Sequence, residues 1–123
     1  MRIFLSAAAL MCSVAVYAHT PVCRCELNGN QVTCQGGYHD GSKAVGVTMR
    51  VIAYSGEALA AGELDSASRF NTALPEQPFY ILMDAGPGEV FEVDWQDIVG
   101  MAGDQFAATG AGGASKDGMP GNY

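Results

Sequence analysis

The sequence has few basic residues, few histidines and a single tryptophan. Its 123 residues contain 6 Lys and Arg against 13 Asp and Glu, with 2 His and a net charge of -7. A chain this acidic repels nucleic acid and anionic membrane surfaces, so we expect neither among its partners. Its charge favours cations, basic protein surfaces or neutral ligands instead.

Motifs of common enzymes are missing as well. The chain has no Gly-x-Ser-x-Gly nucleophile motif, and its Gly86-Pro87-Gly88 turn lacks the Lys and the following helix of a phosphate loop. After the first 18 residues, no apolar run approaches the length needed to span a bilayer. These absences favour a protein that is not an enzyme and whose mature chain does not insert into a membrane.

Residues 1–18 have the pattern of a secretory signal peptide. Arg2 gives a positive start, an apolar run follows, and the Val-Tyr-Ala sequence that ends at Ala18 offers small residues where a signal peptidase reads them. We therefore expect an exported protein, periplasmic or secreted, whose mature chain begins at His19.

A terminal His19 carries an α-amine and an imidazole on one residue, which together chelate Cu(II) or Ni(II). His39, the other imidazole, lies in a Gly-rich loop and is the candidate second ligand. Two histidines with a terminal amine also resemble, more distantly, the site of copper-dependent polysaccharide oxidases. The alternative interpretation is that His19 only marks the cleavage point and that His39 is a solvated turn residue.

Three cysteines remain after removal of Cys12 with the signal peptide: Cys23, Cys25 and Cys34. They flank Asn28-Gly29, a hairpin turn signal. A two-residue turn there places Cys23 opposite Cys34, whereas a register pairing Leu27 with Val32 places Cys25 opposite Cys34. One hypothesis is a structural disulfide from Cys34 to Cys23 or Cys25. The other is a thiolate cluster for Cu(I) or Zn(II).

The rest of the chain predicts an all-β fold, a small antiparallel β-sandwich. Alternating or apolar segments separated by turn signals predict strands at residues 45–54, 69–73, 79–83 and 89–95, whereas residues 58–64 fit either a strand or a helical turn. We expect a cysteine-bearing hairpin at residues 19–36, the sandwich core at 37–98, and a disordered Gly/Ala-rich tail at 99–123.

Five acidic residues gather late in the sequence. They could bind Ca²⁺ only if six or more oxygens converged from a loop, and the alternation of residues 89–95 spreads them along a strand instead. The expected role is a solvated face. The five are Asp84, Glu89, Glu92, Asp94 and Asp97.

Several short motifs resemble carboxypeptidase-regulatory-like or transthyretin-like β-sandwiches. They run from residues 37–41 and 44–47 through Gly56, residues 62–65 and Phe70 to residues 78–81 and 84–86. This pattern is similar to extracytoplasmic domains that accompany nickel and cobalt uptake systems. The resemblance implies a transthyretin-like or Ig-like binding or accessory module rather than a catalyst. Its rival is a structural or protein-interaction sandwich that binds no metal.

Overall fold

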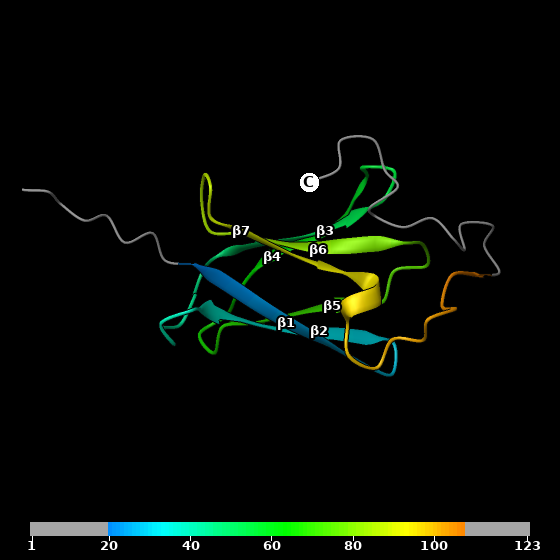
Figure 1. Cartoon of the computed structure of the whole chain (residues 1–123), viewed down its shortest axis with the longest axis horizontal. Coiled ribbons are helices and arrows are strands. Elements are labelled where there is room, and N and C mark those ends of the chain that lie inside the picture. Colours follow the sequence, from blue (N-terminus) through cyan, green and yellow to red (C-terminus); the bar gives the residue numbers. More distant parts are fainter. Residues whose placement is uncertain (1–19, 108–123) are drawn as a thin grey trace, which may run out of the picture.

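The computed structural model describes residues 20–107, which form a two-layer β-sandwich (Figure 1). The two sheets are antiparallel, with strand orders β1-β2-β5 and β4-β3-β6-β7. The predicted fold class is therefore confirmed. The elements are β1 (Pro21–Asn28), β2 (Gln31–Tyr38), β3 (Thr48–Ala53), β4 (Ala58–Glu63), β5 (Arg69–Ala73), β6 (Phe79–Asp84), β7 (Val90–Asp94) and the 3-10 turn η1 (Trp95–Asp97).

The core lies between the sheets and follows the period of two along the strands. In β3, Met49 and Val51 are fully buried and Arg50 between them is exposed. Met49 pairs with Met83 of β6, and Val51 with Ile81, so the two central strands present one apolar face to the other sheet. The alternation predicted over residues 45–54 is confirmed, although the strand begins only at Thr48.

The ambiguous segment at residues 58–64 is the edge strand β4, which pairs with β3. Its small side chains leave room for the opposite sheet. A Cβ on Gly62 would lie 2.7 Å from Cε2 of Phe70, so glycine allows the β5 aromatic ring to pack against this strand. Phe70 is 8% exposed and belongs to the core.

The turn at residues 65–68 forms without a glycine. Ser68 itself adopts a positive φ of 59°, and it is buried. Its hydroxyl accepts the backbone N–H of Ala44 at 2.9 Å, while the Asp65 carboxylate accepts those of Arg69 and Ala67. These hydrogen bonds lower the pKa of the Asp65 carboxyl, and the bond from the Arg69 backbone has the largest effect. Side-chain hydrogen bonds thus support a conformation that glycine usually supplies.

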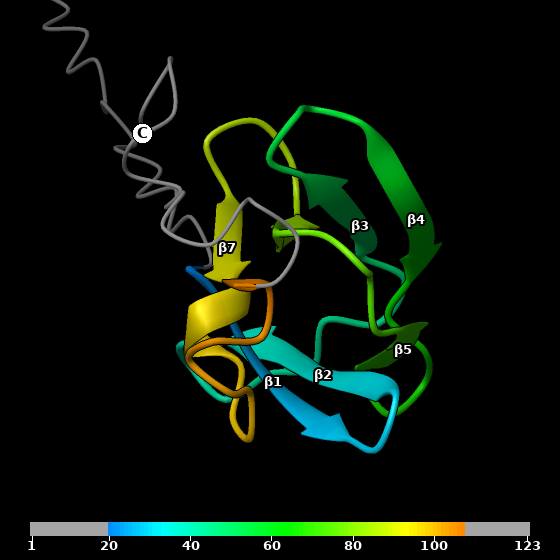
Figure 2. The same ribbon diagram turned by 90° about the vertical axis from the view of Figure 1, so that its right-hand side faces the viewer.

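The sandwich extends beyond the boundary expected at residue 99. Val99 bonds to β1, donating to the Cys25 carbonyl at 3.0 Å and accepting from Leu27 at 2.8 Å. Phe106 is 3% exposed and lies edge-to-face with Trp95, at a centroid distance of 5.0 Å. Figure 2 shows this segment folded back beside η1. The start of the predicted tail therefore belongs to the sandwich.

The predicted signal peptide and the remainder of the predicted tail lie outside the described residues. Within residues 20–107, no helix has the length and apolar character needed to cross a membrane.

Replacing Phe106 by Ala should lower the free energy of unfolding by about 3–5 kcal/mol, because it removes a buried ring that packs on Trp95. Urea denaturation followed by Trp95 fluorescence measures this loss. Gln105→Ala is the control, since Gln105 is exposed and should change stability by less than about 0.5 kcal/mol. Equal, small effects of both substitutions would show that residues 100–107 do not belong to the core.

Candidate functional site

The β1–β2 hairpin carries the three cysteines and leads into the loop that contains His39. Asn28 pairs with Gln31, so the two-residue turn is Gly29-Asn30 rather than the predicted Asn28-Gly29. Gly29 has a φ of 62°, whereas Asn30 is not among the positive-φ residues. This combination fits a type II′ turn, in which glycine occupies the first central position. Compared with a turn at Asn28-Gly29, this turn shifts the pairing of β1 with β2 by one residue on each strand.

This register pairs Cys25 with Cys34, and the two form a disulfide with a Cα–Cα distance of 4.0 Å. Both residues are almost fully buried, with exposures of 1% and 0%. Of the two pairings left open by the sequence, Cys25–Cys34 is thus the one present. The disulfide lies inside the sandwich and links the two strands that carry the other candidate residues.

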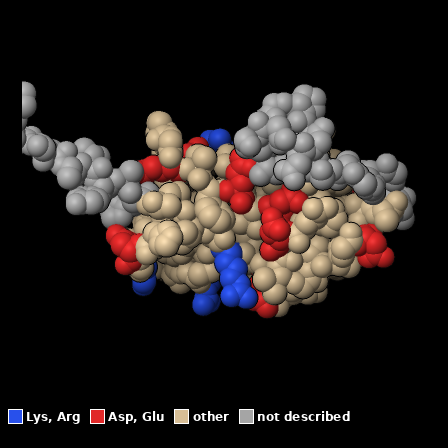
Figure 3. All heavy atoms as spheres, viewed as in Figure 1, with Lys and Arg blue, Asp and Glu red and all other residues tan. Residues whose placement is uncertain are grey.

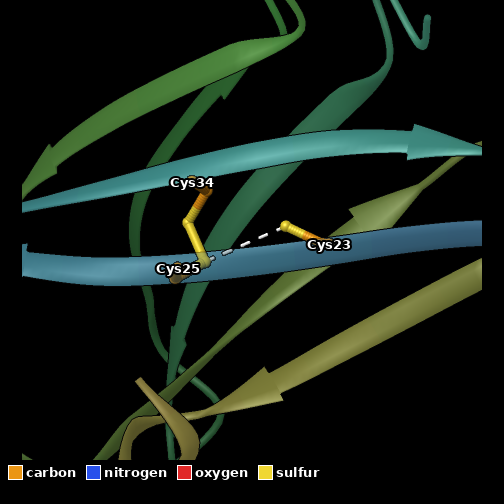
Figure 4. A group of neighbouring side chains, drawn as sticks. All are labelled: Cys23, Cys25 and Cys34. Atoms are coloured by element: carbon orange, nitrogen blue, oxygen red, sulfur yellow. Dashed lines mark hydrogen bonds between the residues drawn. A yellow bond between two sulfur atoms is a disulfide. The ribbon is translucent and has the colours of Figure 1, made fainter. Parts of the chain in front are cut away.

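Cys23 is the free cysteine of the described chain, and it lies on the same face of β1 as Cys25. Figure 4 shows its side chain directed toward the disulfide, with 3.9 Å between the Sγ atoms of Cys23 and Cys25. Burial raises the pKa of the Cys23 thiol to about 11. The thiol is therefore protonated at neutral pH and is a weak nucleophile.

The three sulfur atoms all lie within 4.8 Å of one another. Among the described residues, these cysteines form the one group of three or more His, Cys, Asp or Glu side chains whose ligand atoms lie close enough together to hold a metal ion. In thiol–disulfide exchange the attacking sulfur approaches along the axis of the S–S bond. Cys23 Sγ lies to the side of the Cys25–Cys34 bond and not on its axis, because it is close to both sulfurs. The arrangement thus disfavours exchange of the disulfide with Cys23.

A hollow of about 180 Å³ opens beside this cluster, between β1 and β7. Cys23 and Cys25 line it on one side, and Glu92 and Asp97 approach from the other sheet and η1. Sequence reasoning placed both acids only on a solvated face. Their approach to the cysteines depends on how the two sheets pack, and no local pattern in the sequence carries that information.

His39 is exposed in the loop that follows β2. Its backbone N–H donates to the carbonyl of Thr20 at 2.9 Å, and Pro21 pairs with Tyr38 next to it. Asp40, the next residue, accepts hydrogen bonds from the backbone and hydroxyl of Ser42, which shape the loop. His19 lies outside the described residues, so the structure itself tests neither metal ligand predicted from the sequence.

The late acidic residues do not behave as one solvated face. Asp94 is buried to 9% exposure, contrary to expectation, because it accepts hydrogen bonds from the Tyr54 hydroxyl and the Gln96 backbone and so caps η1. Asp84 accepts the backbone N–H of Gly86 and lies 3.9 Å from Arg50. Figure 3 shows Asp and Glu side chains in several separate groups on the face drawn. Among residues 20–107, these carboxylates do not converge as a group of three or more metal-ligand side chains.

The sequence matches no protein-family model and no curated protein. The fold is similar to the crystal structure of native alpha-2-macroglobulin from Escherichia coli spanning domains NIE-MG1, with a TM-score of 0.57 and 11% sequence identity. The match covers 63% of this chain and 38% of that chain. At this identity the likeness supports the β-sandwich fold alone.

The raised pKa predicts that Cys23 reacts slowly with an alkylating agent. At pH 8 the folded, non-reduced chain carrying Cys12→Ser should react roughly a hundredfold slower than an exposed thiol, and the rate should climb toward pH 11 as thiolate forms. Reactions with iodoacetamide are quenched at a series of times, and mass spectrometry of the alkylated fraction gives the rate.

The matched control combines Cys23→Ser with Ser42→Cys, which moves the free thiol to an exposed position in the loop after β2. Similar rates at pH 8 for the two thiols would contradict the burial of Cys23.

Proposed function

We propose that the mature protein is an exported, non-enzymatic binding module that holds Cu(II) or Ni(II) through His19 and His39. Signal-peptide cleavage after Ala18 supplies the free α-amine of His19. That amine and the His19 imidazole form a chelate, and the His39 imidazole completes three nitrogen ligands. Nitrogen ligands of this kind suit both ions.

The observation that carries this proposal is the hydrogen bond from the His39 N–H to the Thr20 carbonyl, at 2.9 Å. Thr20 is bonded directly to His19, and consecutive Cα atoms are about 3.8 Å apart. Covalent connection alone therefore keeps the mature N-terminus close to the His39 loop. The exposure of His39 leaves its imidazole accessible to an ion from solvent.

Two further features support a cation as the ligand. The net charge of -7 creates a field that attracts cations. The resemblance of the turn and strand motifs to transthyretin-like domains of nickel and cobalt uptake systems points to the same class of ligand.

The proposal predicts that replacing His19 by Ala in the mature chain weakens Cu(II) binding at least tenfold. The substitution keeps the terminal α-amine but removes the imidazole that shares its chelate. His39→Ala should weaken binding by a similar factor, because it removes the third nitrogen. Native mass spectrometry and competition with a chelator of known affinity give the stoichiometry and dissociation constants.

Lys43→Ala is the matched control, because Lys43 is exposed near the end of the same loop and is a poor ligand when protonated. It should bind one Cu(II) as the unaltered chain does. Unchanged affinity in both the His19→Ala and His39→Ala variants would refute the metal site, and the protein would then be treated as an interaction domain.

A further inference from the structure

We propose that the reduced protein contains a second metal site, in which the Sγ atoms of Cys23, Cys25 and Cys34 together bind one Cu(I) ion. The site is independent of the proposed His19–His39 centre. It lies inside the sandwich, at the middle of β1 and β2, whereas His39 follows the end of the hairpin where Pro21 meets Tyr38.

The spacing of the sulfurs fits a shared ion. Metal–thiolate bonds of about 2.3 Å with angles near 120° place two bound sulfurs about 4 Å apart. The Sγ atoms of Cys23 and Cys25 are 3.9 Å apart, and all three sulfurs lie within 4.8 Å of one another. Cys34 Sγ is bonded to Cys25 Sγ in the disulfide, so these two atoms must move apart after reduction before both can bind the same ion.

The chemistry of the cluster selects a soft ion. Three sulfur ligands in a largely apolar interior favour Cu(I), which accepts thiolates in low coordination numbers, over ions that require oxygen ligands. The hollow lined by Cys23 and Cys25 provides a route from the surface to the sulfurs. Cys23 is the partly exposed member at this opening, and the two disulfide cysteines lie behind it.

Two balanced steps convert the disulfide form into the metal form. A dithiol reductant gives two electrons and two protons to the Cys25–Cys34 bond, which becomes two thiols while the reductant closes to its own disulfide. Cu(I) then replaces the protons of the three thiols, forming three Cu–S bonds and releasing three protons. In the disulfide form Cys25 and Cys34 are not available as thiolates, so oxidation removes two of the three ligands.

The test is an anaerobic Cu(I) titration of the chain carrying Cys12→Ser and His39→Ala, which removes the leader thiol and the partner histidine. After dithiol reduction and removal of the reductant, this protein should bind one Cu(I). Adding Cys23→Ser should weaken the affinity at least tenfold, because it leaves two sulfurs while preserving the cysteines of the disulfide. Competition with a Cu(I) chelator gives the affinity, and X-ray absorption counts the sulfur ligands.

Two controls make the outcome decisive. The same protein with its disulfide intact should bind Cu(I) at least tenfold more weakly than the reduced form. Trp95 fluorescence follows the fold, and if reduction loosens it, Cu(I) should restore it with Cys23 present but not in Cys23→Ser. Equal affinities with and without Cys23, or a sulfur count of two, would overturn the proposal whatever the His19–His39 site does.

Discussion

The pairing of Cys25 with Cys34 across the β1–β2 hairpin is the constraint on which the rest of the structure depends. It fixes the register, and the register decides which side chains of both strands enter the core. The same register brings Tyr38 beside Pro21, and so brings the His39 loop to Thr20. A hairpin in the other register would place Cys23 opposite Cys34 and would put Gly37, instead of His39, opposite Thr20. This register thus underlies both proposed sites.

Much of the fold could be predicted from the sequence because the strands carry local signals. The alternation in residues 45–54 and the apolar run at 79–83 predict β3 and β6, which form the central pair of the larger sheet. The hairpin register could not be predicted, since the Asn-Gly pair permitted two turns with different cysteine pairings. The burial of Phe106 could not be predicted either. It depends on contacts with the rings of Trp95 and Phe79, and no sequence pattern around Phe106 indicates these contacts.

The candidate site, like the fold, could be predicted only in part from the sequence. Local sequence identifies cysteines and histidines as ligand types, but their convergence is a tertiary property. Cys23 and Cys25 share a strand face by the period of two, which the sequence shows, whereas Glu92 and Asp97 reach the same hollow only through packing of the two sheets. Asp94, predicted to face solvent, is buried because Tyr54 and Gln96 satisfy its carboxylate.

The most direct test of this account is disulfide mapping by trypsin after the free thiol is blocked with N-ethylmaleimide in acidic denaturant. Trypsin cleaves after Arg24, between the two candidate partners of Cys34, and next after Lys43. The account predicts a labelled peptide that contains Cys23, and a peptide of residues 25–43 that lacks two hydrogens because its disulfide is internal. A peptide containing Cys23 linked to residues 25–43, with the label on Cys25, would contradict the register on which the His39–Thr20 hydrogen bond and the sulfur cluster depend.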